Sequence, residues 1–261
     1  MQRRVQMKGE ELFDKDGRRI TKDLKSAISD ANRNYHLVQP QMTSEEDYAN
    51  RFIRLEGLID ITVGQFKNES EHLLNIIQSD PQISNIVNGI HLPVIVSQMS
   101  VNNLGNTLEW YLDSAGESYK KTFKNREFHN YRKGTLTNAV SIVPESRHDR
   151  LIEVMKSKTV VGIYFPNPLQ GFSICADREQ MVTLPEGFIL SGLDVVIGMI
   201  MYPDVLARDW YTLGFDLAAF SWQSVDSSLC FKAHVDRLNF VNTGLLGYAL
   251  DSFSGGLLFL G

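Results

Sequence analysis

Several residues in the second half of the chain are of types that could do acid–base or nucleophilic chemistry. Cys230 and His234 lie four residues apart, but the alternating apolar pattern of residues 228–236 predicts a strand. On a strand these residues would stand about 13 Å apart, whereas proton transfer needs about 3 Å. They therefore cannot form a thiolate–imidazole pair with each other.

Aspartates recur through the same region and could converge on a magnesium ion, which prefers oxygen ligands. Their irregular spacing is equally typical of loop ends and helix caps, and we favour that interpretation. An enzyme with a nonstandard site built from these aspartates or from Cys230 remains the first alternative function. The aspartates are Asp204, Asp209, Asp216, Asp226, Asp236 and Asp251.

Cations alternate with aromatic side chains at residues 118–134 (SYKKTFKNREFHNYRKG). Cations bind phosphates and aromatic rings stack on bases, so this stretch could bind single-stranded nucleic acid. The more ordinary interpretation is a helix C-terminus, where cations are favoured by the helix dipole and aromatics pack inward. Nucleic-acid binding is therefore the least favoured alternative. Its candidate residues are Lys120, Lys121, Lys124, Arg126, Arg132 and Lys133.

The common motifs of cofactor and metal sites do not occur in the sequence. There is no GxGxxG, GxxxxGK[ST], HExxH, GxSxG or paired CxxC. His148 beside Asp149 supplies at most two metal ligands, fewer than the three or four that a zinc site needs. We therefore expect no cofactor and no bound metal.

The first half of the chain has the periodicity of helices. Apolar residues at helical spacing predict a helix from Thr21 to Tyr35 and another at residues 101–124. Ser44 followed by three acidic residues predicts the start of a further helix, which we expect to continue to Ser79. At 1.5 Å per residue this helix would be about 50 Å long. Its apolar stripe offers a partner-binding face through Tyr48, Phe52 and Phe66.

The second half of the chain has the sequence patterns of strands and of one apolar helix. TVVGIYF from Thr159, GFSICA, residues 228–236 and LLFL near the end are expected to be strands, and HLPVIV at residues 91–96 an edge strand or a connection. Residues 184–206 form the most apolar segment, interpreted as a buried helix that begins near Ser191. Too short for a bilayer and carrying Asp194, this segment does not predict a membrane span.

Charge divides the chain at the same point. Residues 1–158 hold 22 Lys and Arg against 21 Asp and Glu, whereas residues 159–261 hold 4 against 10. We expect an irregular arm at residues 1–20, a helical region at 21–158 and a C-terminal α/β domain at 159–261. The predicted fold class is α+β, or α/β: a helical N-terminal region packed on a C-terminal domain with a small mixed sheet and one buried apolar helix.

Composition is that of a globular protein, and the net charge of −5 argues against a general binder of polyanions. The two cysteines, without CxxC spacing, suggest buried, reduced thiols and a cytoplasmic location. Without catalytic motifs, and with broad amphipathic helices, the favoured function is a non-catalytic interaction or assembly protein. We expect an adaptor or accessory subunit that forms a homodimer or joins a larger complex.

Overall fold

Two sheets form the framework of the protein in a computed structural model that describes residues 10–30, 34–55 and 59–261. The four-stranded sheet is antiparallel throughout, and the five-stranded sheet is mixed, with parallel pairs at its two edges. The first has the order β1 (Leu92–Val96), β4 (Val160–Phe165), β11 (Leu257–Phe259) and β5 (Phe188–Leu190). The second has the order β10 (Phe253–Ser254), β6 (Gly214–Asp216), β8 (Ser228–Ala233), β9 (Arg237–Thr243) and β2 (Glu127–Asn130). A separate antiparallel pair joins β3 (Val140–Ile142) and β7 (Phe220–Trp222).

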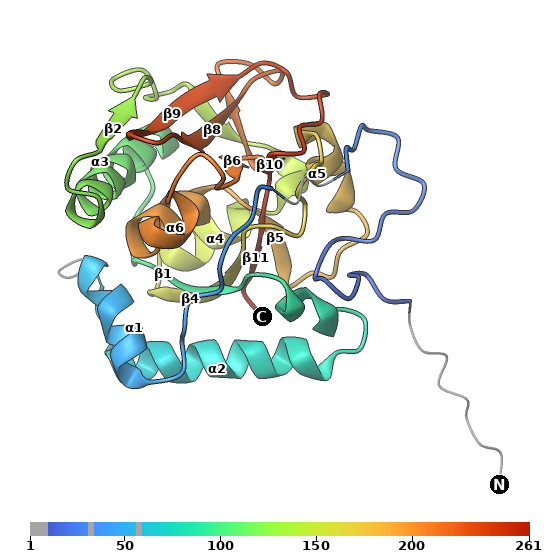
Figure 1. The fold of residues 1–261 in the computed structure, drawn as a ribbon, viewed down its shortest axis with the longest axis horizontal. Coiled ribbons are helices and arrows are strands. Elements are labelled where there is room, and N and C mark those ends of the chain that lie inside the picture. Colours follow the sequence, from blue (N-terminus) through green and yellow to red (C-terminus); the bar gives the residue numbers. More distant parts are fainter. Residues whose placement is uncertain (1–9, 31–33, 56–58) are drawn as a thin grey trace, which may run out of the picture.

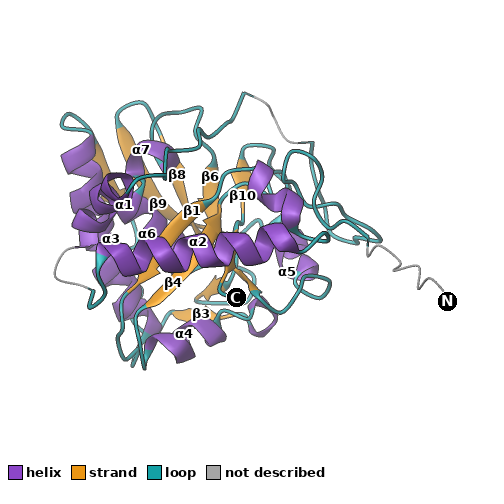
Figure 2. Ribbon diagram, turned by 90° about the horizontal axis from the view of Figure 1, so that it is seen from below, coloured by secondary structure: helices purple, strands orange, loops and turns teal. Residues whose placement is uncertain are grey.

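Helices cover the sheets and fill the space between them (Figures 1 and 2). The helix α2 crosses the four-stranded sheet and contacts β4, while α6 contacts β1 and packs against α3. The helices are α1 (Glu45–Phe52), α2 (Val63–Ser79), α3 (Leu104–Thr122), α4 (Asp149–Met155), α5 (Ile174–Gln180), α6 (Leu193–Met201) and α7 (Pro203–Leu206). Short 3-10 turns lie at Ile53–Leu55, Ser84–Asn88 and Pro144–Ser146. The fold class is α+β, as the sequence predicts.

Several elements agree with the sequence patterns. Ser44 caps α1 in a capping box, because its hydroxyl accepts from the Asp47 N–H and the Asp47 carboxylate accepts from the Ser44 N–H. The segment around Pro93 is an edge strand, where a residue without an N–H costs no ladder hydrogen bond. The strands β4, β8 and β11 and the helix α3 also lie where they are predicted.

The helix predicted from Ser44 to Ser79 is wrong: two helices lie there, α1 and α2. A second capping box, formed by Thr62 and Gln65, starts α2. The two helices pack against each other, and the Tyr48 and Phe66 rings meet edge to face with centroids 5.1 Å apart. Phe66 is fully buried and Tyr48 is 1% exposed.

The helix predicted at residues 21–35 is also wrong. Residues 21–30 form no helix, and residues 31–33 lie outside the described part. The backbone of this segment bonds to α5 and to its N-terminal flank: Ser29 N–H to the Gly171 carbonyl, and the Lys25 and Ser26 N–H groups to the Glu179 carboxylate. These partners replace the i to i−4 bonds of a helix.

GFSICA, predicted to be a strand, leads into the helix α5. The Ser173 hydroxyl accepts from the Ala176 N–H and caps it. A short apolar run does not distinguish a strand from a buried helix. The apolar helix α6 is present but begins at Leu193, because β5 takes up residues 188–190 and Gly192 is the N-cap.

The predicted arm at residues 1–20 falls partly outside the description, which begins at residue 10. Residues 10–20 form no helix, but they are packed rather than loose. Phe13 is fully buried and bridges to Arg19 around a turn at Gly17. The predicted boundary at residue 159 falls between β1 and β4, which pair with each other.

Candidate functional site: a buried acid pair beside a small cavity

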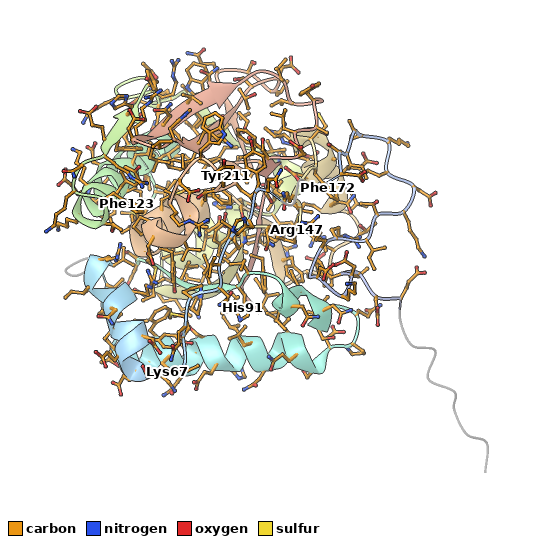
Figure 3. All side chains as sticks on the ribbon, in the orientation of Figure 1. Lys67, His91, Phe123, Arg147, Phe172 and Tyr211 are labelled. Atoms are coloured by element: carbon orange, nitrogen blue, oxygen red, sulfur yellow. The ribbon has the colours of Figure 1, made fainter. Side chains whose placement is uncertain are left out.

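A cavity of about 230 Å³ lies on one face of the five-stranded sheet, beneath the loop that joins β9 to β10. Most of its wall is apolar, and its polar groups are a carboxyl, a thiol, an amide and two hydroxyls. Pockets for drug-sized ligands span about 300–1,000 Å³, so this one suits a smaller molecule. It is lined by Phe172, Ile174, Asp216, Cys230, Asn242, Thr243, Leu245, Tyr248, Leu250 and Phe253. Figure 3 labels Phe172 in this wall.

Strand register brings Asp216 and Cys230 together. The two residues are Cα partners across the antiparallel pair of β6 and β8, so their side chains stand on the same face of the sheet. Asp216 is 6% exposed and Cys230 is 4% exposed. The cavity therefore has a carboxyl and a thiol side by side in its wall.

A second carboxyl, that of Asp177, lies close to Asp216. It comes from α5 and is fully buried, and neither of its oxygens has a hydrogen-bond partner in the described part of the chain. Gly255 permits this position, because a Cβ at residue 255 would lie 2.2 Å from Asp177 Oδ2. A larger residue at 255 would displace the carboxylate.

Burial sets the protonation of these groups. Desolvation disfavours the charged form; it raises the pKa of Asp216 to about 7. Desolvation, and then the charge of Asp216, raise the pKa of Asp177 well above its ordinary range. Burial likewise raises the pKa of the Cys230 thiol, with a further contribution from Asp216. Burial therefore favours the protonated forms of Asp177 and Cys230, while Asp216 is close to half-ionised at neutral pH.

The carbonyls of Leu246, Asp251 and Ser252 anchor the loop over the cavity by accepting hydrogen bonds, and several side chains between them are exposed. Leu246 is buried, and its carbonyl accepts from the Cys175 N–H at 3.0 Å. Leu245, Tyr248 and Leu250 line the cavity yet remain 70%, 64% and 40% exposed. These side chains lie between the cavity and solvent, so a small ligand would enter past them.

A second buried polar cluster lies at the start of α6, and hydrogen bonds account for its histidine. His148 Nδ1 lies 3.1 Å from the Leu190 carbonyl, and Nε2 lies 3.3 Å from the Leu193 N–H. The first contact requires a proton on Nδ1 and the second requires an unprotonated Nε2, which assigns the neutral tautomer. Burial lowers the pKa of His148 to about 4, in agreement. His148 therefore completes the N-terminus of a helix.

Asp194 belongs to the same cluster. Its carboxylate accepts from the Gly192 N–H at 2.7 Å, while burial raises its pKa to about 6. Asp194 Oδ1 lies 4.0 Å from His148 Nδ1, beyond hydrogen-bond distance. The side chains of His148 and Asp194 thus accept hydrogen bonds from backbone N–H groups at the buried start of α6.

The partner-binding face predicted from Tyr48, Phe52 and Phe66 is not an exposed stripe. Tyr48 and Phe66 are covered by the chain's own helices, and Phe52 is half-buried, with its ring centroid 6.5 Å from that of Phe66. The packing of α1 against α2 is the reason. A face that one continuous helix would present to a partner becomes the contact between two helices.

The basic stretch is divided by the fold. Lys120, Lys121 and Lys133 line one groove along α3, whereas Lys124 is exposed outside it. Arg126 donates to the Arg208 carbonyl. Arg132 lies over the Trp222 ring, 5.2 Å from its centroid. The six cations look equivalent in the sequence, but only three of them line the groove.

The predicted aspartates do not converge. Asp204 forms a bidentate ion pair with Arg51, Asp209 pairs with Arg208, and Asp236 pairs with Arg237. Asp216 alone of the six lines the cavity. In the part of the chain that the structure describes, no group of three or more His, Cys, Asp or Glu side chains could hold a metal ion.

Sequence reasoning missed Asp177. GFSICA, just before Asp177, is expected to be a strand. Asp177 follows this apolar run among polar residues, as many surface aspartates do. The available signal was Ser173, whose spacing to Ala176 and Asp177 is that of a helix N-cap. A helix there would have placed Asp177 on the same turn as Ser173, facing inward.

Comparisons with known proteins add nothing to this picture. The chain matches no protein family, no curated protein and no solved structure. Among the described residues, no helix combines the length and apolar character needed to cross a membrane.

Proposed function

We propose that the protein is an enzyme that acts on a small, mainly apolar molecule by proton transfer through Asp216. The observation that carries the proposal is a carboxyl with a pKa of about 7 in the wall of a cavity. A general acid or base is most effective when its pKa is near the working pH. Strongly perturbed carboxyls in cavities are frequent at catalytic sites.

Asp177 has a supporting role in this proposal. Burial raises the pKa of its carboxyl well above the ordinary range and so favours the neutral form beside Asp216. An ionised, unpaired carboxylate at this depth would cost several kcal/mol. Burial alone raises the pKa of Asp216, and a protonated Asp177 adds no charge beside it.

The raised pKa of Cys230 favours the aspartate over the thiol as the reactive group. The thiolate is the nucleophilic form of cysteine, and Cys230 has almost none of it at neutral pH. The cavity wall suggests the class of substrate. Its aliphatic and aromatic side chains would hold a hydrocarbon portion, and Asn242 and Thr243 would bind one or two polar atoms.

The test uses a mixture of small metabolites, with mass spectrometry to follow which compounds are consumed. We expect the wild type to convert at least one compound of about ten non-hydrogen atoms or fewer, and Asp216→Asn to lose this conversion. Asp226→Asn, at an exposed position, is the matched control. Leu250→Trp should also abolish conversion by filling the mouth of the cavity. Equal conversion by the wild type and Asp216→Asn would contradict the proposal.

A magnesium titration distinguishes proton transfer by Asp216 from the binding of a cation at the two carboxyls. A ligand that binds only the folded state raises the melting temperature. A rise with millimolar magnesium that Asp216→Asn removes would show that the acid pair holds a cation. That result would replace the proton-transfer proposal.

An interaction protein remains the second candidate, supported by an exposed apolar surface. Trp210, Tyr211 and Val235 are 43%, 57% and 73% exposed, and the Trp210 ring lies 5.0 Å from that of His234. Exposed apolar patches mark contact sites on many proteins. Light scattering at micromolar concentration tests it: we expect a concentration-dependent mass that Val235→Asp abolishes. A constant monomeric mass would count against self-association.

A further inference from the structure

A groove that is separate from the cavity lies along α3. It has a volume of about 1080 Å³. In Figure 3 Phe123, just after α3, and Phe172, in the cavity wall, lie on opposite sides of the view. The groove is lined by Ile53, Arg54, Trp110, Asp113, Ser114, Gly116, Glu117, Ser118, Lys120, Lys121, Thr122, Phe128, Asn130 and Lys133.

Helix geometry explains why these residues share one wall. Trp110, Asp113, Glu117 and Lys121 follow at intervals of three and four along α3, so they form a stripe on one face. From Trp110 to Lys121 the stripe is about 16 Å long. That is the length of about five stacked nucleotides at 3.4 Å each.

Cations outnumber carboxylates along the groove. Arg54, Lys120, Lys121 and Lys133 face two acids, Asp113 and Glu117. The net charge of the chain is −5, so this local excess of positive charge is opposite in sign to the whole molecule. Among the described residues, Lys121 has no ion-pair partner closer than 4.0 Å.

The ion pairs in the groove are exposed and easily exchanged. Lys133 lies 3.0 Å from Asp113, and Lys120 lies 3.6 Å from Glu117. All four side chains are more than half exposed. Exposed ion pairs contribute little to stability, so a phosphate could replace either carboxylate as the partner of the lysine at low cost.

Aromatic rings lie among these cations. The Trp110 side chain is 39% exposed in the groove wall. Phe128 reaches the groove from β2 and packs against α3 at Gly116, where a Cβ would lie 2.5 Å from the Phe128 ring. Gly116 thus leaves room for the Phe128 ring in the groove wall. Aromatic side chains beside a cationic track are the features that hold single-stranded nucleic acid.

We propose that this groove binds single-stranded nucleic acid, with Lys120, Lys121, Lys133 and Arg54 on the phosphates and Trp110 stacked on a base. The proposal does not depend on the cavity or on Asp216. It assigns half of the cations of the basic stretch to the ligand and excludes Lys124, Arg126 and Arg132. It also adds Arg54 and Trp110, which lie outside that stretch.

Fluorescence anisotropy with labelled 12-nucleotide oligo(dT) and oligo(U) tests the proposal. We expect binding at 50 mM salt that weakens as salt rises, with a log–log slope of about −3 for four phosphate contacts on a single strand. The variant Lys120→Glu, Lys121→Glu, Lys133→Glu should bind at least tenfold more weakly, with a slope reduced by about two. No change in anisotropy for the wild type at 50 mM salt would overturn the proposal.

A charge-matched control separates the groove from general electrostatics. The variant Lys15→Glu, Lys22→Glu, Lys124→Glu makes the same three charge reversals at exposed positions outside the groove. It should bind within about threefold of the wild type. If it loses as much affinity as the groove variant, the binding is non-specific and the assigned site is wrong.

Two further variants test the stacking and the competing acids. Trp110→Ala should weaken binding by about five- to a hundredfold with an unchanged salt slope, because a stacked base depends little on salt. Asp113→Asn with Glu117→Gln should strengthen binding, since it removes the competing carboxylates. Unchanged affinity of Trp110→Ala, or displacement of the oligonucleotide by an equal concentration of polyglutamate, would contradict a nucleic-acid ligand.

Discussion

At the scale of single residues, Asp216 is central to the proposed function. Its carboxyl has a neighbour of the same type, is almost completely buried and still faces a cavity. At a pH above the ordinary pKa of aspartate, an aspartate whose pKa is strongly raised by folding destabilises the folded state. Sites retained at such a cost are often functional.

Asp216→Asn should therefore make the protein more stable at high pH. The pKa of Asp216 is about 7 when folded against an ordinary 3.8, so the unfolded chain releases this proton first. The free energy of unfolding then falls as the pH rises from about 4 to about 7. This difference corresponds to at most about 4 kcal/mol. Urea unfolding should show Asp216→Asn equal to the wild type at pH 4 and more stable at pH 8.

The exposed change Asp226→Asn serves as the control and should leave this pH dependence intact. A variant Asp216→Asn that is equally or less stable than the wild type at pH 8 would show that Asp216 has no raised pKa.

His148 has the opposite dependence on pH. Its pKa is about 4 when folded against an ordinary 6.5, so the stability it confers is present above pH 6.5 and lost as the pH falls toward 4. His148→Ala leaves the Leu193 N–H and the Leu190 carbonyl unpaired, at about 1–3 kcal/mol each. Urea unfolding should show a loss of about 3–5 kcal/mol at pH 7.5, and about 1 kcal/mol less at pH 5.5. His72→Ala, at an exposed site, should cost little at either pH, and a loss that is independent of pH would contradict the buried neutral imidazole.

At the scale of elements, the contact between α1 and α2 is part of the core. Phe66 is fully buried between Tyr48 and Phe52. A protein that presented these rings to a partner would lose its association when one of them changed. A protein that buries them loses stability instead.

Phe66→Ala should lower the free energy of unfolding by about 3–5 kcal/mol, as large-to-small changes in a core do. Phe52→Asp should destabilise the chain, because it places a charge against the same ring. Ile53→Ala, at a side chain that is 65% exposed, should cost less than about 1 kcal/mol. Chemical denaturation measures all three, and a folded, fully stable Phe66→Ala would show that α1 does not pack on α2.

At the scale of the whole molecule, the two halves of the chain share their sheets. The strand β1 pairs with β4, and β2 pairs with β9. The Ser118 hydroxyl of α3 donates to the Ile200 carbonyl of α6 at 2.6 Å. Residues 159–261 therefore do not supply all the strands of either sheet.

We therefore predict that residues 159–261 do not fold alone, whereas the full chain unfolds in one cooperative transition. The fragment loses an edge strand from each sheet and exposes the face of α6 that α3 covers. Near-ultraviolet circular dichroism and thermal unfolding of the fragment and the full chain test this. A fragment with a sharp transition and native-like aromatic signals would establish an independent C-terminal domain.

Elements whose signals are local can be predicted from the sequence alone. The capping box at Ser44, the alternation of β8 and the proline of an edge strand depend on neighbours within a few residues, so they could be read directly. The apolar helix α6 was also visible, although Gly192 rather than Ser191 begins it. The α+β class follows from such elements taken together.

The tertiary structure decided everything that depends on distant partners. Residues 21–30 have the periodicity of a helix, but Gly171 and Glu179 supply their backbone hydrogen bonds. The sequence offered six aspartates of equal standing, and the register of β6 against β8 selected Asp216. Burial, which the sequence does not encode locally, then raised its pKa toward neutrality and gave the candidate site its chemistry.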